Sequence, residues 1–189
     1  MVGEVKKQRG SVVGQFPVTA FIRRLPTGMF YVYLPMSLNE KSHHATIVLE
    51  RTYRAPLERV FSEFADPAVR ARWGPPSSDV LIYDQTDFRA GGRDLFRCGP
   101  KNDPKFRGET LYHLIVPNKR VVSSETLDTD GQRLAVSLNT LDFEATGEST
   151  NLKLTVQMVS LVGAGMIEGY ESGHNSALEN LARHLSSTR

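Results

Sequence analysis

The sequence is poor in the residues and segments that mark several common classes of protein. Its 189 residues include one cysteine and one tryptophan. The single cysteine, Cys98, excludes an internal disulfide and a cysteine-based zinc cluster, as is usual in a reducing cytoplasm. No apolar run approaches the roughly 20 residues that a membrane-spanning helix needs. The N-terminal segment also lacks the cleavage site of a secretory signal. We therefore expect a cytoplasmic protein with no membrane contact.

Motifs for metal, phosphate or cysteine chemistry are also lacking. The histidines and carboxylates form no His-x-x-x-His, His-Glu-x-x-His or clustered acidic pattern, so no metal is expected. Gly91-Gly92 joins two predicted strands instead of opening a helix, which makes it a turn and not a phosphate-binding loop. A catalytic role for Cys98 would need a histidine partner that the sequence does not place beside it, and free cysteine is usually a small buried residue. We expect no cofactor.

The net charge of +2 is distributed unevenly along the chain. Residues 1–42 carry six basic and two acidic side chains, which leaves a net charge of −2 for the remainder. A mildly acidic domain lacks the basic patch that nucleic-acid binding requires, so we expect no nucleic-acid partner.

Composition changes near His43. The prolines at positions 17, 26 and 35 interrupt any regular element before it, and the apolar run from Phe30 to Leu34 has no evident strand to pair with. We predict residues 1–42 to be a poorly ordered or mis-started N-terminal extension, with Met36 as the alternative start. Residues 43–189 are predicted to form one folded domain.

The apolar periodicity of residues 43–189 predicts an α+β fold. A strand at 44–54 precedes a helix ending near Ala65 and a second short helix at 66–73, in which Asp66 is the N-cap and Pro67 opens the first turn. Six strands follow, at about 78–88, 92–98, 105–116, 119–128, 132–144 and 150–160. An apolar stripe from Ile167 to Leu185 then predicts a long terminal helix. A curved antiparallel sheet wrapped around that helix would bury both apolar surfaces.

Several short motifs recur in the order of a known family. They are Tyr53-Arg54-Ala55-Pro56 with Val60-Phe61, Asp66-Pro67 with Ala71-Arg72-Trp73-Gly74-Pro75, Asp87-Phe88-Arg89-Ala90-Gly91-Gly92-Arg93, Phe106-Arg107-Gly108 with Pro117-Asn118-Lys119-Arg120-Val121-Val122, and Gly173 with Leu178 and Leu181. Over residues 44–187 the chain resembles the SRPBCC (START-like, helix-grip) superfamily. The closest resemblance is to the branch named after the C-terminal domain of the activator of the 90-kDa heat-shock protein ATPase.

The resemblance implies a cavity between the sheet and the terminal helix that binds a hydrophobic or amphipathic small molecule. The sequence departs from the family at two positions. Arg72 precedes a single Trp73 where two aromatics are common, and His174 stands where a Trp often follows the helix glycine. Residues 1–42 are too short for the separate N-terminal domain of the chaperone activator, so we do not carry chaperone activation over to this chain.

Eight residues are candidates for the cavity wall: Trp73, Phe96, Tyr112, Phe143, Met158, Met166, Tyr170 and His174. No catalytic residue is assigned, because a core histidine is the simpler interpretation of His174, as a helix anchor is of Trp73. Asp84, Asp87 and Glu125 are interpreted as solvated strand residues. Two other functions stay open: a cyclase- or hydrolase-type enzyme using His174 or Tyr170, and a co-chaperone-like protein-binding module. A homodimer through exposed strand edges also stays open.

Overall fold

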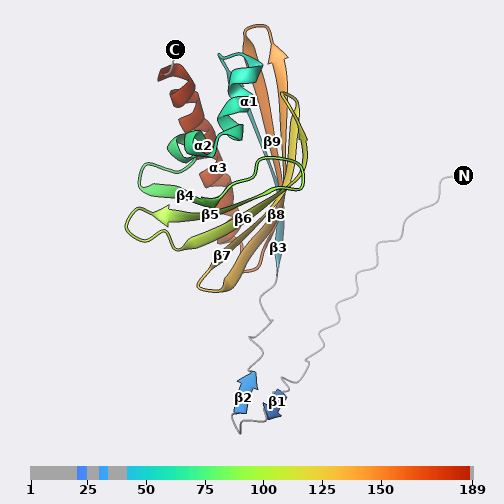
Figure 1. Ribbon diagram of the computed structural model, residues 1–189, viewed down its shortest axis with the longest axis vertical. Helices are drawn as coiled ribbons and strands as arrows, with labels where there is room; N and C mark the ends of the chain where they lie inside the picture. The colour runs from blue at the N-terminus through green and yellow to red at the C-terminus, as the bar shows by residue number, and fades with distance from the viewer. Residues whose placement is uncertain (1–20, 25–29, 34–41, 188–189) are drawn as a thin grey trace, which may run out of the picture. The chain divides into compact units, whose positions relative to one another are not determined.

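The computed structural model describes residues 21–24, 30–33 and 42–187 (Figure 1). The chain divides into two compact units, residues 1–39 and 40–189, and each is described by itself. Most of the predicted extension, including the alternative start at Met36, lies outside the described residues.

The first unit contains one pair of described strands. β1 (Phe21–Arg24) pairs antiparallel with β2 (Phe30–Tyr33), with Phe21 opposite Tyr33. The apolar run at Phe30–Leu34 was expected to lack a strand to pair with, and this expectation was wrong. The reason lies in the positions of the prolines, since Pro17 and Pro26 fall outside the paired residues and so interrupt no ladder hydrogen bond.

The second unit consists of a seven-stranded sheet and three helices. In chain order these are β3 (His43–Tyr53), α1 (Leu57–Ala65), α2 (Pro67–Trp73), β4 (Asp79–Gln85), β5 (Arg93–Pro100), β6 (Phe106–Val116), β7 (Arg120–Thr129), β8 (Gln132–Thr146), β9 (Ser149–Ser160) and α3 (Gly165–Ser187). The sheet order is β3-β9-β8-β7-β6-β5-β4, and all neighbours are antiparallel. Figure 1 shows the sheet curving around α3. The predicted α+β helix-grip fold is confirmed.

Local signals explain why these elements form where they do. In β9 the buried Leu152, Leu154 and Val156 alternate with polar residues, as a strand with one covered face requires. The Asp66 carboxylate accepts hydrogen bonds from the backbone N–H groups of Ala68 (2.8 Å) and Val69 (3.3 Å), and thereby caps α2.

The Gly91-Gly92 pair forms a turn at the end of a longer connection, because β4 already ends at Gln85. The backbone N–H of Gly92 donates to the carbonyl of Arg89 (2.8 Å), and Gly91 has a φ of +79°. Such a φ favours glycine at this turn position. The turn also pairs with β6 through the N–H of Tyr112, which donates to the Gly92 carbonyl. It therefore fixes the start of β5.

The core lies between the inner face of the sheet and the three helices. Beneath α1 it is filled by aromatic rings. Phe143 of β8 packs edge-on against Phe61 (5.3 Å between centroids) and Phe64 (5.4 Å). Farther along the sheet, Leu178 and Leu181 of α3 are buried almost completely. Between these two regions the packing leaves a cavity.

Candidate functional site

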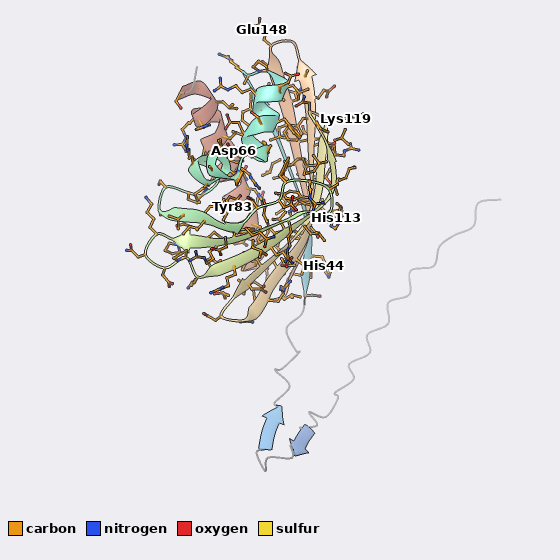
Figure 2. All side chains as sticks on the ribbon, in the orientation of Figure 1. His44, Asp66, Tyr83, His113, Lys119 and Glu148 are labelled. Atoms are coloured by element: carbon orange, nitrogen blue, oxygen red, sulfur yellow. The ribbon has the colours of Figure 1, made fainter. Side chains whose placement is uncertain are left out.

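The cavity lies between the inner face of the sheet, α2 and α3, and has a volume of about 400 Å³. Five of the eight predicted wall residues line it: Trp73, Phe96, Tyr112, Tyr170 and His174. Tyr83 of β4 also lines it, whereas His44 and His113 lie on the outer face of the sheet (Figure 2).

The other three predicted residues do not line the cavity. Phe143 belongs to the aromatic cluster beneath α1. Met158 is buried in the core on β9, and Met166 packs against the core near the start of α3. Phe143 and Met158 are buried and Met166 is partly buried, so all three belong to the core or its edge and not to the cavity wall.

Two glycines leave room in and behind the wall, Gly173 in the wall itself and Gly108 behind the Phe96 ring. A Cβ added to Gly173 of α3 would meet no atom within 4 Å, so there is open space beside this residue at the cavity wall. On β6, Gly108 provides room for the Phe96 ring, which a Cβ at that position would approach to 2.0 Å. The width of the cavity therefore depends on residues that lack a side chain.

A buried ion pair forms one side of the cavity wall. The guanidinium of Arg70, on α2, donates to Asp94 Oδ2 (2.7 Å) and to the Tyr112 hydroxyl (2.9 Å). Tyr112 in turn donates to Asp94 Oδ2 (2.5 Å), and the backbone N–H of Asp87 donates to Asp94 Oδ1 (2.9 Å). Burial raises the pKa of Tyr112, so the hydroxyl keeps its proton. The charge of Arg70 is thus matched by the fully buried Asp94.

Glu125, on β7, is the polar residue that the sequence analysis misplaced. It was interpreted as a solvated strand residue, but its carboxylate lines the cavity and accepts hydrogen bonds from Thr110 Oγ1 and the Tyr170 hydroxyl, both at 3.4 Å. The phase of the strand explains the correction, because Glu125 shares a face with the inward-pointing Val121 and Leu127. Asp84 and Asp87 instead pair with arginines near the surface.

Burial shifts the titration of three cavity residues. It raises the pKa of Glu125 to about 7, because no cation among the described residues compensates the charge. It lowers the pKa of His174 to about 4, so the imidazole is neutral near pH 7. It raises the pKa of Cys98 to about 11, so the thiol stays protonated and is a poor nucleophile.

Three further polar atoms of the wall are unusual. Asn139 Oδ1, Trp73 Nε1 and Arg70 Nε are buried and have no hydrogen-bond partner among the described residues. The ring of His174 packs edge-on against Tyr170, with 5.8 Å between centroids, and makes no hydrogen bond to another described residue. Because buried polar atoms are normally paired, these groups are available to a molecule inside the cavity.

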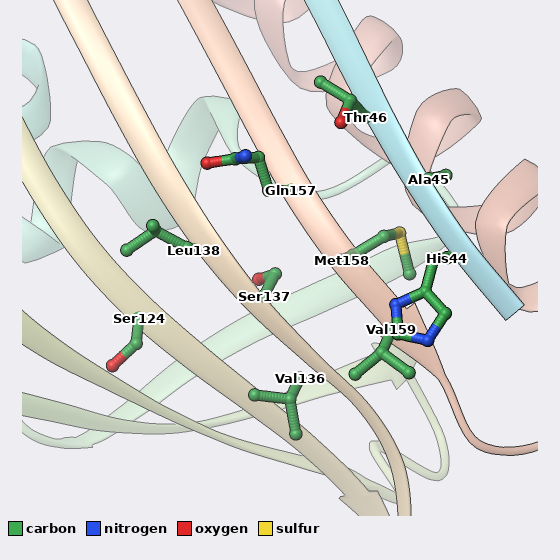
Figure 3. Close-up of a pocket in the computed structure, with 10 residues that line it drawn as sticks. All are labelled: His44, Ala45, Thr46, Ser124, Val136, Ser137, Leu138, Gln157, Met158 and Val159. Atoms are coloured by element: carbon green, nitrogen blue, oxygen red, sulfur yellow. The ribbon is translucent and has the colours of Figure 1, made fainter. Parts of the chain in front are cut away.

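A second depression, of about 620 Å³, lies on the outer face of the sheet (Figure 3). Residues of β3, β7, β8 and β9 line it, and it is wide open to solvent. Of its residues only His44 is ionisable. It therefore has neither the enclosure nor the converging polar groups of the cavity beneath α3.

Within the described part of the chain, no cluster of three or more His, Cys, Asp or Glu residues could hold a metal ion. In the same residues, no helix is both long and apolar enough to cross a membrane.

The sheet, the long helix on its inner face and the cavity between them define a helix-grip domain of the ligand-binding type. The family model described as "Activator of Hsp90 ATPase homolog 1-like protein" matches residues 54–186. The chain belongs to this family, and the predicted resemblance is confirmed.

Solved structures show the same fold. A protein from Rhizobium loti is 32% identical, with a TM-score of 0.67 over 76% of this chain and 99% of that chain. An uncharacterized protein from Rhizobium leguminosarum is 29% identical, with a TM-score of 0.69 over 78% of this chain and 97% of that chain. A search of curated proteins gave no match.

Proposed function

We propose that the chain binds a small apolar or amphipathic molecule in the cavity between the sheet and α3. The observation that carries this proposal is the cavity of about 400 Å³, lined mainly by apolar and aromatic side chains with a few polar groups. That composition is typical of small-molecule sites. Membership of a family whose domain type binds ligands supports the same function.

Proton transfer by His174 or Tyr170 has less support. With its pKa lowered to about 4, His174 is a weak base near pH 7, and burial raises the pKa of Tyr170, which makes its hydroxyl a weak acid. A protein-binding module that works through its surface would not need an internal cavity. Binding of a small molecule therefore explains the cavity and its few polar groups better than either alternative does.

Trp73 offers a direct test, because it is the only tryptophan of the chain and lines the cavity. Decanol is titrated into the wild type, into Gly173→Leu and into Ser172→Leu. Leucine at position 173 projects into open space at the cavity wall, whereas Ser172 is exposed and does not line the cavity. We expect saturable changes in fluorescence for the wild type and for Ser172→Leu, and none for Gly173→Leu.

Native mass spectrometry of protein purified from cells identifies the natural ligand class. A co-purifying small molecule that is lost in Gly173→Leu would support the proposal. The protein-binding alternative would be favoured by three results together. These are no co-purifying molecule, no decanol binding by the wild type, and capture of a chaperone ATPase in a pull-down.

A further inference from the structure

The charges that line the cavity are unbalanced. Arg70 is the only Arg or Lys among the described residues that line it, and its charge is already matched by Asp94. His174 is neutral near pH 7. Two carboxylates also line the cavity, Asp79 beside Pro76 and Glu125 farther along the sheet. The wall therefore has an unmatched acidic group and no cation without an ion-pair partner among the described residues, although the buried Nε–H of Arg70 has no acceptor there.

Glu125 has unused capacity to accept hydrogen bonds. Each carboxylate oxygen receives one long hydrogen bond, Oε1 from Tyr170 and Oε2 from Thr110, both at 3.4 Å. An ionised carboxylate offers about four lone-pair positions, so both oxygens can accept a further donor. Among the described residues Glu125 has no ion-pair partner.

A second acceptor lies close to Glu125 on the same face of the sheet. Asn139 of β8 is opposite Ser123, and Ser137 is opposite Glu125, so Asn139 and Glu125 are diagonal neighbours across two paired strands. Asn139 Oδ1 is buried without a donor. A protonated amine has only donors, and it can satisfy both oxygens at once.

We propose that the cavity selects an amphipathic amine over a carboxylate of the same length, with Glu125 as the anionic partner and Asn139 as a second acceptor. This inference rests on the proposed binding function. The ammonium group would form an ion pair with Glu125 in a desolvated site, and the apolar tail would lie against the aromatic wall. A carboxylate headgroup would instead meet Glu125 with no cation to offset the repulsion, at a large desolvation cost.

The test compares three probes of equal chain length, decylamine, decanol and decanoate, titrated against Trp73 fluorescence near pH 8. In the wild type we expect decylamine to bind about tenfold more tightly than decanol, and decanoate to bind most weakly. Glu125→Gln keeps the size of the side chain and removes the charge. It should lower decylamine affinity to that of decanol and leave decanol affinity within about twofold.

The matched control is Glu109→Gln. Glu109 lies on the neighbouring strand β6 on the outer face of the sheet, and its side chain is 45% exposed. This variant should behave as the wild type does. Should Glu125→Gln not fold, Glu125→Leu serves the same comparison, since it removes the buried polar group altogether.

The outcomes separate the two proposals. Failure of all three probes to bind the wild type would overturn the binding function and this inference together. Decanol binding without a preference for decylamine would overturn the amine inference alone, and so would a preference that survives in Glu125→Gln.

Discussion

Two residues of the cavity should give the protein an unusual dependence of stability on pH. Desolvation acts on Glu125 and His174 in opposite directions, because it disfavours the charged form of each. It raises the pKa of Glu125 from 4.5 to about 7. It lowers the pKa of His174 from 6.5 to about 4. Both shifts span about the same range of pH, which makes their effects comparable.

The two contributions have opposite signs. Between pH 4.5 and 7 the folded protein keeps a proton on Glu125 that the unfolded chain has released, so this contribution to stability is complete below pH 4.5 and is lost as the pH rises through 7. Between pH 6.5 and 4 the unfolded chain takes up a proton that folded His174 does not, so stability is lost as the pH falls. Each contribution amounts to about 3 kcal/mol, at 1.36 kcal/mol per pH unit.

In the wild type the pH dependences of the two contributions nearly cancel between pH 4.5 and 6.5. Replacing one of the two residues leaves the pH dependence of the other uncompensated. Relative to the wild type, Glu125→Gln should gain about 3 kcal/mol in free energy of unfolding as the pH rises from 4.5 to 7. His174→Gln should gain about the same relative to the wild type as the pH falls from 6.5 to 4. Urea unfolding followed by far-UV circular dichroism measures both differences.

Exposed residues provide the controls, Glu109→Gln for the carboxylate and His44→Gln for the imidazole. Their differences from the wild type should not vary with pH by more than about 0.5 kcal/mol, as for surface changes in general. The reasoning is refuted if the Glu125→Gln and His174→Gln differences are equally flat. It is also refuted if both differences change with pH in the same direction.

Two further predictions concern the cavity wall. Arg70→Leu leaves Asp94 buried without its cation, so we expect the free energy of unfolding in urea to fall by about 3–5 kcal/mol. The double variant with Asp94→Leu should recover most of this loss, and no recovery would contradict the buried Arg70–Asp94 ion pair. Gly108→Ala places a methyl group against the Phe96 ring and turns that ring into the cavity. We expect weaker decanol binding by Trp73 fluorescence at a stability cost of about 1–3 kcal/mol, and unchanged affinity would show that Phe96 moves elsewhere.

Most of the fold could be predicted because its signals are local. Asp66 and Pro67 mark the start of α2 within two residues, and the alternation in β9 shows directly which residues are covered. The apolar run that contains the strand Phe30–Tyr33 was noted, but its pairing with a second strand was not expected. Its partner lacks a clear pattern, since Phe21–Arg24 has only four residues and ends in two arginines.

The cavity was harder to predict, because its wall is assembled from residues far apart in the chain. Arg70 contacts Asp94, 24 residues away, and Tyr112, 42 residues away, and nothing local to any of them shows this. Alternation along a strand places Phe143 and Met158 on the covered face. It does not show which part of that face is filled by α1 and which part remains open. The inward position of Glu125 could have been predicted, because residues 121, 125 and 127 fall on the same face of the strand and Val121 and Leu127 are apolar. This pattern outweighs the usual expectation that a strand glutamate is solvated.

The glycines of the wall argue that the cavity is a maintained feature and not a packing fault. Gly169 and Gly173 are four residues apart on α3, both line the cavity, and neither would bring a Cβ within 4 Å of another residue, although Gly169 is also exposed to solvent. Glycine inside a helix costs about 1 kcal/mol relative to alanine, so two of them weaken α3 where larger residues would fit without a clash. The space that Gly173 leaves lies along the wall that carries Tyr170 and His174. A helix selected for stability alone would fill this space, whereas a helix that shares a wall with a bound molecule must leave it open.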